Sequence, residues 1–266
     1  MLRPKKSLCQ PIKRDHMRSY SRSIIETVAR QDDYGINIWF LPKDFLAAYV
    51  ESDCEVLCPE ERARFEKILI KPKSIARLGS RMMLRQMIAA HLECTPQEIV
   101  FAYSNLGKPS VENENGKEKV YFSVSHTADG SLLSISPRVP HAIDIESLRD
   151  ISSLESLAKL VLSEVELADL QGLSGEEKQN RFYRYWTCKE AILKRNGSGL
   201  SGNPKALTVD LTDEQPSILK YPDTFERTEV SELVLWHTPS WIAAIAASST
   251  AKFIQLHLKP TEPEMC

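Results

Sequence analysis

The chain has 266 residues, of which 42% are hydrophobic, and its formal net charge is -2 at pH 7. This composition suits a globular protein with a sizeable core, and the small net charge excludes a generally basic coat for nucleic acid. No apolar run approaches the roughly 20 residues that a membrane span needs, and the start of the chain lacks the apolar core of a signal peptide. We therefore expect a cytoplasmic protein that binds neither a membrane nor nucleic acid.

The start of the chain differs in composition from the remainder. Residues 1–33 contain many lysines, arginines and serines and few acidic residues, a composition typical of a flexible arm. Such an arm could be merely solvated, recruit an acidic partner or direct the protein to an organelle. We expect two structured halves after it, residues 34–139 and residues 140–259, and a short tail, residues 260–266.

Hydrophobic spacing predicts a strand at residues 36–40, a charged helix at residues 59–70 and a longer helix at residues 74–92. Along the longer helix three arginines recur every four residues: Arg77, Arg81 and Arg85. This row could be a solvated face, or it could contact phosphate, with Arg81 as the first candidate.

Short apolar runs bounded by turn residues predict the other strands: 99–103, 120–126, 131–136, 141–146, 207–211, 232–236, 241–247 and 253–258. Helices are predicted between them: 154–162, a second that begins at 163, and 176–194, which ends at a glycine. This order of mixed strands and helices, in two halves of similar pattern, predicts an α+β fold.

Two loops of the first half carry candidate ligand contacts. In the turn after residue 104, Gly107 permits close approach of the backbone, and the rigid Pro109 fixes the direction of Lys108. The strand at 120–126 ends in Ser125 and His126, whose side chains could meet a ligand or satisfy a turn.

The strand at 141–146 alternates apolar and acidic residues. Strand geometry places Asp144 and Glu146 on one side and Ile143 and Ile145 on the other. Two carboxylates on one face repel each other unless a cation lies between them. This strand is therefore a candidate metal-binding strand.

The helix at 176–194 carries a third carboxylate. Residues four apart share a helix face, so Trp186, Glu190 and Lys194 line up, and Lys189 lies about a quarter-turn away. Together with the acidic strand, Glu190 would complete a three-oxygen set of the kind that Mg²⁺ accepts. Lysines beside such a metal indicate phosphate chemistry, although an exposed strand face, an exposed helix pair and a core tryptophan remain the structural alternative.

The ordered motifs resemble the Sfp-type 4'-phosphopantetheinyl transferases, which move the phosphopantetheine arm of coenzyme A (CoA) to a serine of a carrier protein. The resemblance extends from Pro59 to Ser201 and rests on these segments: the helix with Arg81, Gly107-Lys108-Pro109, Phe122 to His126, Ile143 to Glu146, Phe182 to Trp186, Lys189-Glu190 with Lys194, and Gly199-Leu200-Ser201. The family pattern has glycine where this chain has Ala142, which affects only local backbone geometry.

The resemblance implies two pseudo-twofold-related α+β halves with the active site in the cleft between them. It implies that three carboxylates hold Mg²⁺ against the CoA diphosphate: Asp144, Glu146 and Glu190. It implies that phosphate and adenosine contacts come from Arg81, Lys108, Pro109, Ser125, His126, Lys189 and Lys194, and that catalysis depends on Glu190, Lys194 and Lys189. The carrier serine would attack the β-phosphate of CoA, 3',5'-ADP would leave, and Glu190 or a water that it orients would be the base.

Other functions stay open at this stage. An Asp, a Glu and a Lys can also build a metal-dependent nuclease site, although the usual Glu and Lys of such a site lie one residue apart on a strand. A non-catalytic module that binds CoA or a carrier protein is a further alternative. The smaller holo-acyl-carrier-protein synthase type is disfavoured by the length of the chain. We expect a monomer that acts on an acyl or peptidyl carrier of fatty-acid, polyketide or nonribosomal peptide synthesis.

Overall fold

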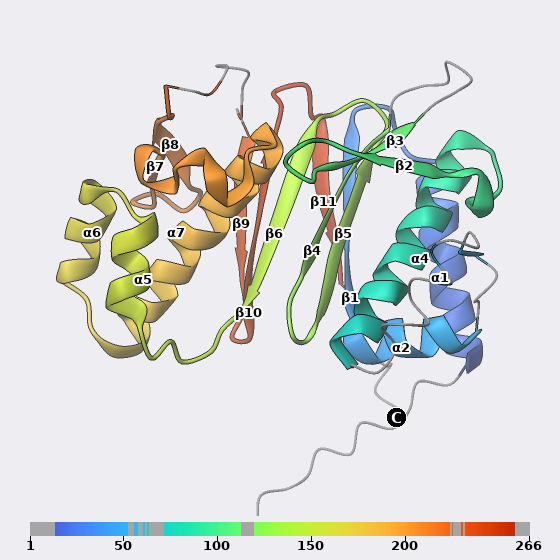
Figure 1. Cartoon of the computed structure of the whole chain (residues 1–266), viewed down its shortest axis with the longest axis horizontal. Helices are drawn as coiled ribbons and strands as arrows, with labels where there is room; N and C mark the ends of the chain where they lie inside the picture. The colour runs from blue at the N-terminus through green and yellow to red at the C-terminus, as the bar shows by residue number, and fades with distance from the viewer. Residues whose placement is uncertain are drawn as a thin grey trace, which may run out of the picture.

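Two β-sheets lie in the middle of the molecule, and helices cover the outer side of each sheet (Figure 1). The computed structural model describes residues 14–52, 56–57, 61, 63, 72–112, 120–223, 225, 230 and 232–258. The predicted helix at 59–70 lies almost entirely outside these residues. In the part of the chain that is described, no helix is long and apolar enough to cross a bilayer.

In its described residues, the first half combines a four-stranded sheet, a short hairpin and three α-helices. The sheet has the order β11-β1-β5-β4, in which β11 is the strand Phe253–His257 from the end of the chain; β1 is antiparallel to β5 and β5 is antiparallel to β4. The elements are α1 (Arg14–Ala29), β1 (Gly35–Pro42), α2 (Lys43–Ser52), α4 (Pro72–Leu92), η2 (Pro96–Glu98), β2 (Val100–Tyr103), β3 (Pro109–Glu112), β4 (Tyr121–His126) and β5 (Gly130–Ser136).

The second half has a three-stranded antiparallel sheet of order β6-β10-β9 and a separate pair, β7 with β8. Its elements are β6 (His141–Ser147), α5 (Leu154–Val161), α6 (Glu164–Gln171), α7 (Gly175–Asn196), η3 (Gly199–Gly202), η4 (Pro204–Ala206), β7 (Thr208–Asp210), β8 (Ser217–Lys220), β9 (Glu232–His237) and β10 (Trp241–Ala247). Gly197 ends α7 with a φ of 82°, as the glycine signal predicted.

The last strand, β11 (Phe253–His257), returns to the first half. It pairs in parallel with β1, so that Ile36 lies opposite Ile254 and Ile38 lies opposite Leu256. The prediction that residues 140–259 all belong to the second half is therefore wrong for β11, because this strand completes the sheet of the first half. Nothing local to the strand reveals a partner more than 200 residues earlier in the chain.

The two sheets pack against each other through apolar side chains. A buried cluster between them draws residues from both sheets: Ile36, Ile38, Leu132, Val139, Ile143, Ile145, Ala243, Ile245 and Ala247. The alternation predicted for β6 is confirmed, because Ile143 and Ile145 enter this cluster while Asp144 and Glu146 face the opposite side, toward α7.

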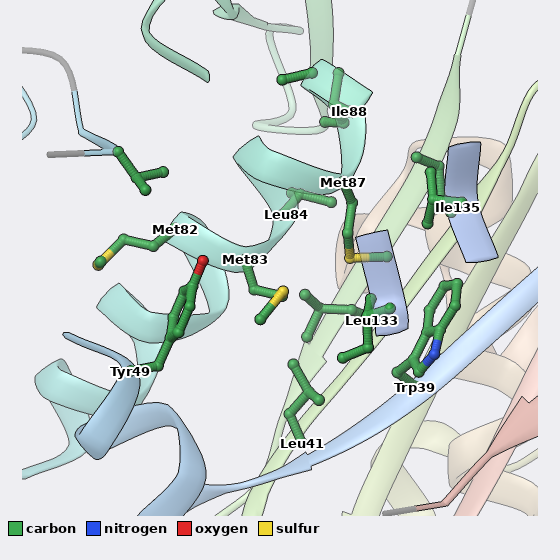
Figure 2. Packing of buried hydrophobic residues seen from close by; sticks show 14 of the residues in the cluster. Trp39, Leu41, Tyr49, Met82, Met83, Leu84, Met87, Ile88, Leu133 and Ile135 are labelled. Carbon is green, nitrogen blue, oxygen red and sulfur yellow. The ribbon is translucent and has the colours of Figure 1, made fainter. Parts of the chain in front are cut away.

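The outer face of the first sheet packs on α1, α2 and α4, and Figure 2 shows Met83 and Met87 of α4 pointing toward Leu133, while Met82 lies near Tyr49. The flexible arm expected at residues 1–33 is wrong for residues 14–29, which form α1. Buried side chains of α1 anchor it in the same core: Met17, Ile24 and Val28.

Serine side chains join the two sheets where β4 and β6 run side by side. Ser123 Oγ accepts a hydrogen bond from the backbone N–H of Ile143 at 3.1 Å, and Ser125 Oγ accepts one from that of Ile145 at 3.4 Å. At the end of this junction the buried His141 contacts Ser134 Oγ through Nε2 at 2.8 Å and the carbonyl of Val139 through Nδ1 at 2.9 Å. These bonds hold β6 against the first sheet and so fix the position of its carboxylates.

Candidate active site

Side chains from both halves meet where β4, β6 and α7 come together. Beside them lies a cavity of about 470 Å³, lined by Lys43, Ala76, Arg77, His126, Thr127, Ala128, Ser131, Glu146, Ser147, Arg149 and Tyr183. The lining comes from α2, α4 and β4 on one side and from β6 and α7 on the other. The predicted position of the site between the halves therefore matches the observed architecture.

Asp144 is the centre of the polar contacts. Its Oδ1 accepts a hydrogen bond from Ser125 Oγ at 2.7 Å and lies 2.6 Å from Lys194 Nζ. Lys194 also donates to Ser125 Oγ at 3.2 Å. The Asp144 side chain is 4% exposed and the Lys194 side chain 31% exposed, so the ion pair lies at the boundary between the interior and solvent.

Glu146 lies two residues further along β6. Its Oε1 accepts a hydrogen bond from the indole Nε1 of Trp186 at 2.8 Å. Burial raises the pKa of Glu146, and the nearby Asp144 charge raises it further. The sequence suggested only a packing role for Trp186, but the structure shows that it also orients a carboxylate of the site.

Glu190 completes the acidic group from α7. Burial raises the pKa of Glu190 to about 7, with Asp144 adding to the increase and Lys194 opposing it. Within the residues that the structure describes, two buried carboxylate oxygens have no hydrogen-bond partner: Asp144 Oδ2 and Glu190 Oε1. Buried acceptors of this kind are costly unless a donor or a cation is supplied.

The three carboxylates influence one another electrostatically, but they do not converge as one set of metal ligands. Across the described part of the chain, no three His, Cys, Asp or Glu side chains are grouped so that they could hold one metal ion. The Lys194 ammonium is the cation that contacts Asp144. The role of Asp144, Glu146 and Glu190 as magnesium ligands therefore stays a prediction.

His126 ends β4 at the edge of the cavity. Its Nδ1 lies 2.8 Å from Ser131 Oγ, which in turn accepts a hydrogen bond from Ser80 Oγ of α4 at 2.7 Å. Loss of water around the ring, followed by the positive charges of Arg77 and Lys194, lowers the pKa of His126 to about 4. The imidazole is thus neutral near pH 7.

The β2–β3 hairpin carries Lys108 and Pro109. Gly107 adopts a φ of 80°, in the left-handed region that glycine enters readily. Lys108 Nζ donates to the carbonyl of Arg195 at 2.9 Å, which ties the hairpin to the last turn of α7. Neither Lys108 nor Pro109 lines the cavity described above, and their contact with adenosine stays a prediction.

The arginine row divides into different roles. Arg81 Nε lies 2.9 Å from Glu61 Oε1, its guanidinium donates to Tyr103 Oη at 3.1 Å and it lies over the ring of Phe101. Arg81 does not line the cavity described above, and its role as the first phosphate-binding arginine stays a prediction. Arg85 is buried and donates to the carbonyls of Pro96 and Ile99, which leaves Arg77 as the arginine of the row that lines the cavity.

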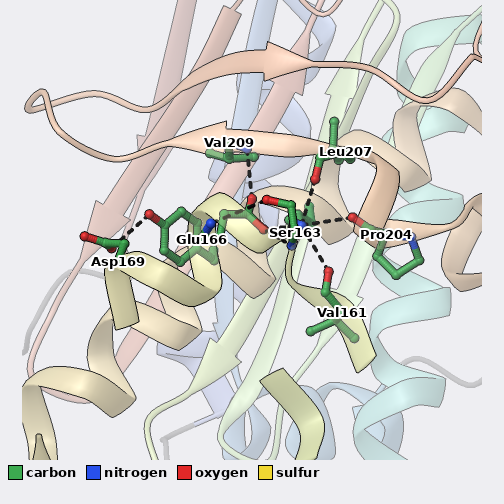
Figure 3. A network of polar contacts seen from close by, with 9 residues as sticks. Val161, Ser163, Glu166, Asp169, Pro204, Leu207 and Val209 are labelled. Atoms are coloured by element: carbon green, nitrogen blue, oxygen red, sulfur yellow. Dashed lines mark hydrogen bonds and ion pairs between the residues drawn. The ribbon is translucent and has the colours of Figure 1, made fainter. Parts of the chain in front are cut away.

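Lys189 has a different environment from the one predicted. Its ammonium forms a buried ion pair with Glu166 and donates to the carbonyls of Val161, Pro204 and Leu207 at 2.8 to 3.0 Å. Figure 3 shows Glu166 and these carbonyls converging on that position. The prediction that Lys189 neutralises phosphate was wrong, because its side chain is 1% exposed and its contacts are with the end of α5, with α6 and with the segment after α7.

Several lining residues were not predicted from sequence, among them Lys43, Arg149 and Tyr183. Lys43 is the first residue of α2, a helix that the sequence did not predict. No motif marks it, because its nearness to His126 depends on the pairing of β1 with β5. Arg149 lies two residues after the end of β6 and was not singled out from the sequence.

Comparisons with known proteins agree with the motif order. Residues 44–137 match the family model "4'-phosphopantetheinyl transferase, N-terminal", and residues 140–246 match "4'-phosphopantetheinyl transferase superfamily". The chain is 30% identical over 185 residues to the 4'-phosphopantetheinyl transferase HetI of Nostoc sp., across 70% of this chain and 78% of that protein. It is 25% identical over 208 residues to the 4'-phosphopantetheinyl transferase Sfp of Bacillus subtilis, across 78% of this chain and 85% of that protein.

One solved structure is also similar. A holo-(acyl-carrier-protein) synthase from Bacillus anthracis, in complex with CoA (3',5'-ADP), matches at 22% identity with a TM-score of 0.36, over 41% of this chain and 96% of that chain. The assignment rests instead on the family models, which cover both halves, and on the curated relatives. The chain belongs to the 4'-phosphopantetheinyl transferases, the enzymes that transfer the phosphopantetheine group of CoA to carrier proteins.

Proposed function

We propose that this transferase requires Mg²⁺ and that its reaction centre is formed by Asp144, Glu146, Glu190 and Lys194. Two buried oxygens, Asp144 Oδ2 and Glu190 Oε1, have no hydrogen-bond donor among the described residues, and they lie beside the ion pair of Asp144 with Lys194. This observation carries the proposal. Anionic oxygens that are buried and unsatisfied in the free protein fit a hard divalent cation.

The chemistry of the residues present fits this ion. All three acidic groups offer oxygen ligands, and the pKa values of Glu146 and Glu190 are raised by burial and by their acidic neighbours. A nearby cation would relieve the repulsion among them. Bound Mg²⁺ would supply positive charge to the diphosphate of CoA and lower the energy of the charge that develops on it.

The chain's own residues would align the substrates. Lys194 is partly exposed and already faces Asp144, so its ammonium can contact a phosphate oxygen without leaving the site. Ser125 holds both groups in register through hydrogen bonds to each. Phosphoryl transfer needs mainly such alignment and charge neutralisation.

Glu190 is the proposed proton acceptor. The serine hydroxyl oxygen of the carrier forms a bond to the β-phosphorus of CoA, the bond from that phosphorus to the oxygen of 3',5'-ADP breaks, and the hydroxyl proton passes to Glu190 directly or through a water that Glu190 orients. A base is most effective when its pKa lies near the working pH, and a pKa of about 7 for Glu190 suits that role.

The test is a transfer assay with Glu190→Gln. The purified protein is incubated with CoA, Mg²⁺ and a panel of apo carriers from fatty-acid, polyketide and nonribosomal peptide synthesis, and each carrier is weighed by mass spectrometry. The wild type should add one phosphopantetheine group, whereas Glu190→Gln should lose roughly 100-fold or more in turnover, the range typical of a general base. Lys220→Met, an exposed position on β8, is the control and should retain activity.

The same assay separates the rival functions. Turnover of Glu190→Gln near the wild-type rate would remove Glu190 from the mechanism. Turnover without Mg²⁺, after chelation, would remove the metal. Binding of CoA with no transfer to any carrier would favour a non-catalytic module, and Mg²⁺-dependent cleavage of DNA would favour a nuclease.

We also propose that the enzyme acts as a monomer. Ser125 and His126 come from the first half, and Asp144, Glu146, Glu190 and Lys194 come from the second half of the same chain. One copy therefore contains both sides of the site. Light scattering during size-exclusion chromatography tests this proposal, and a dimer that persists on dilution contradicts it.

A further inference from the structure

Hydroxyl side chains join the two halves at every second residue where β4 and β6 run side by side. The first two links run from Ser123 and Ser125 to backbone N–H groups of β6. The third joins Thr127, the first residue after β4, to Ser147, the last residue of β6. Since Ser147 directly follows Glu146 in the chain, this third link fixes the part of β6 that carries the Glu146 carboxylate.

A carboxylate outside the acidic group of the site completes this third link. Ser147 Oγ donates a hydrogen bond to Asp129 Oδ2 at 2.6 Å. A serine hydroxyl has one proton, so the contact between Thr127 and Ser147 uses the proton of Thr127. Ser147 is 7% exposed, and its hydroxyl therefore has little access to water as an alternative acceptor. Asp129 thus sets the direction of both hydrogen bonds.

The first half holds the backbone of Asp129 in place. The carbonyl of Asp129 accepts a hydrogen bond from the backbone N–H of Lys43, and the carbonyl of Gly130 accepts one from that of Thr127, both at 2.9 Å. Gly130 lies so close to β1 that a Cβ atom on it would be 2.4 Å from the carbonyl oxygen of Leu41. The turn that carries Asp129 is therefore fixed to the sheet of the first half.

Ser147 and Glu146 are coupled through the backbone of β6. Neighbouring residues of a strand point to opposite sides: Glu146 points to α7, where it meets Trp186, and Ser147 points to Asp129. The peptide unit between the two residues is planar and rigid. A displacement of Ser147 therefore moves Glu146 as well, although Asp129 does not touch Glu146 itself.

Arg149 is the other partner of Asp129. Its guanidinium lies 3.7 Å from Asp129 Oδ2, and both side chains are more than half exposed. Exposed ion pairs of this kind contribute little. The bond from Ser147 is shorter and comes from a buried hydroxyl, so it is the contact through which Asp129 acts.

We propose that Asp129 is a positioning residue of the transfer reaction, which acts through Ser147 to hold Glu146 in place against the first half. This inference rests on the proposed function, which includes Glu146 in the reaction centre. Folding does not depend on Asp129, because the apolar cluster between the sheets and the links from Ser123 and Ser125 remain without it. Its loss should disturb alignment instead, and a misplacement of about 1 Å can cost roughly 100-fold in rate.

The experiment measures kcat for carrier modification and the midpoint of urea unfolding. Asp129→Ala should lower kcat about 10- to 100-fold and change the midpoint little. Asp129→Asn keeps an acceptor oxygen for Ser147 and should recover most of the rate. Ser147→Ala should resemble Asp129→Ala, and the double variant should lose little more, because both changes break one link. The matched control, Asp213→Ala in the exposed turn between β7 and β8, should retain full activity.

A second readout needs neither substrate nor metal. The indole Nε1–H of Trp186 donates to Glu146, so its signal in a ¹H–¹⁵N NMR spectrum reports the position of that carboxylate. The signal is assigned as the one that disappears in Trp186→Phe. Asp129→Ala should shift it and leave unchanged the indole signal of Trp39, which stacks on His257 in the first half. Asp129→Asn should largely restore the signal of Trp186.

Three results would overturn the inference. An unchanged kcat in Asp129→Ala would remove Asp129 from the alignment of the site. A lowered kcat with an unshifted Trp186 signal would show that Asp129 does not act through Glu146. A large fall in the unfolding midpoint that Asp129→Asn does not reverse would give Asp129 a purely structural role. If the wild type modifies no carrier, the proposed function fails, and the Trp186 signal still decides whether Asp129 positions Glu146.

Discussion

Replacement of Lys189 by Met tests the assignment of this residue to the interior. The change deletes an ammonium that pairs with Glu166 and donates to three backbone carbonyls, and it leaves a carboxylate of 0% exposure without its counter-charge. Removal of one partner of a buried pair costs about 3–5 kcal/mol. For a chain of this size that corresponds to a fall in Tm of roughly 6–20 °C.

The residual contacts of Glu166 shape the expected result. Its carboxylate also accepts hydrogen bonds from the backbone N–H of Ser163 at 2.7 Å and that of Val209 at 2.9 Å, so it remains partly satisfied in the Lys189→Met variant. Adding Glu166→Gln to the Lys189→Met variant removes the unpaired carboxylate charge and should recover part of the lost stability. The double variant should thus be more stable than the sum of the two single changes predicts.

The assay combines urea unfolding followed by circular dichroism with carrier transfer at a temperature where the variants are folded. Lys189→Met should lower the midpoint of unfolding and leave KM for CoA unchanged. The reasoning is refuted if stability is retained while KM for CoA rises, because Lys189 would then contact substrate phosphate as the sequence first suggested.

Two further predictions concern Trp186 and His141. Trp186→Phe keeps an aromatic ring but removes the 2.8 Å hydrogen bond to Glu146. If Glu146 binds Mg²⁺ as proposed, the Mg²⁺ concentration at half-maximal activity should rise about tenfold or more, because this is the usual effect of losing a group that orients a metal ligand. An unchanged Mg²⁺ dependence would contradict that role. Burial lowers the pKa of His141 from 6.5 to about 4, so the unfolded chain binds the proton first and stability falls as the pH drops below 6.5. Between pH 7 and pH 5 this histidine should account for about 2 kcal/mol of lost stability. Urea unfolding of His141→Gln should therefore show a smaller loss of stability over this pH range than the wild type. An equal loss in the wild type and in His141→Gln would show that other groups cause the pH dependence.

The sequence predicted the parts of the site that depend on local geometry. Strand alternation predicted that Asp144 and Glu146 share one face of β6, and helix periodicity predicted that Glu190 and Lys194 share one face of α7. In the structure these two faces meet. Lys189 follows the same helix rule but turns away from that face, and its true partner, Glu166, comes from α6. Its environment therefore depended on tertiary packing that no motif encodes.

Two elements were misjudged for different physical reasons. In α1 the many serines and arginines obscured three widely spaced apolar residues, Met17, Ile24 and Val28. The segment is helical because these side chains pack against α4 and α2. In β11 the strand itself was predicted, but its pairing with β1 was not. Parallel pairing between distant segments leaves no signal in either segment alone.

The place of β11 has a consequence for biosynthesis. A nascent chain that ends anywhere before residue 253 leaves one side of β1 without hydrogen-bond partners, together with the apolar side chains of Ile36 and Ile38. The sheet of the first half can therefore close only after residues 253–257 have left the ribosome. A premature stop shortly before this strand should yield an aggregation-prone product although it contains every side chain of the proposed reaction centre.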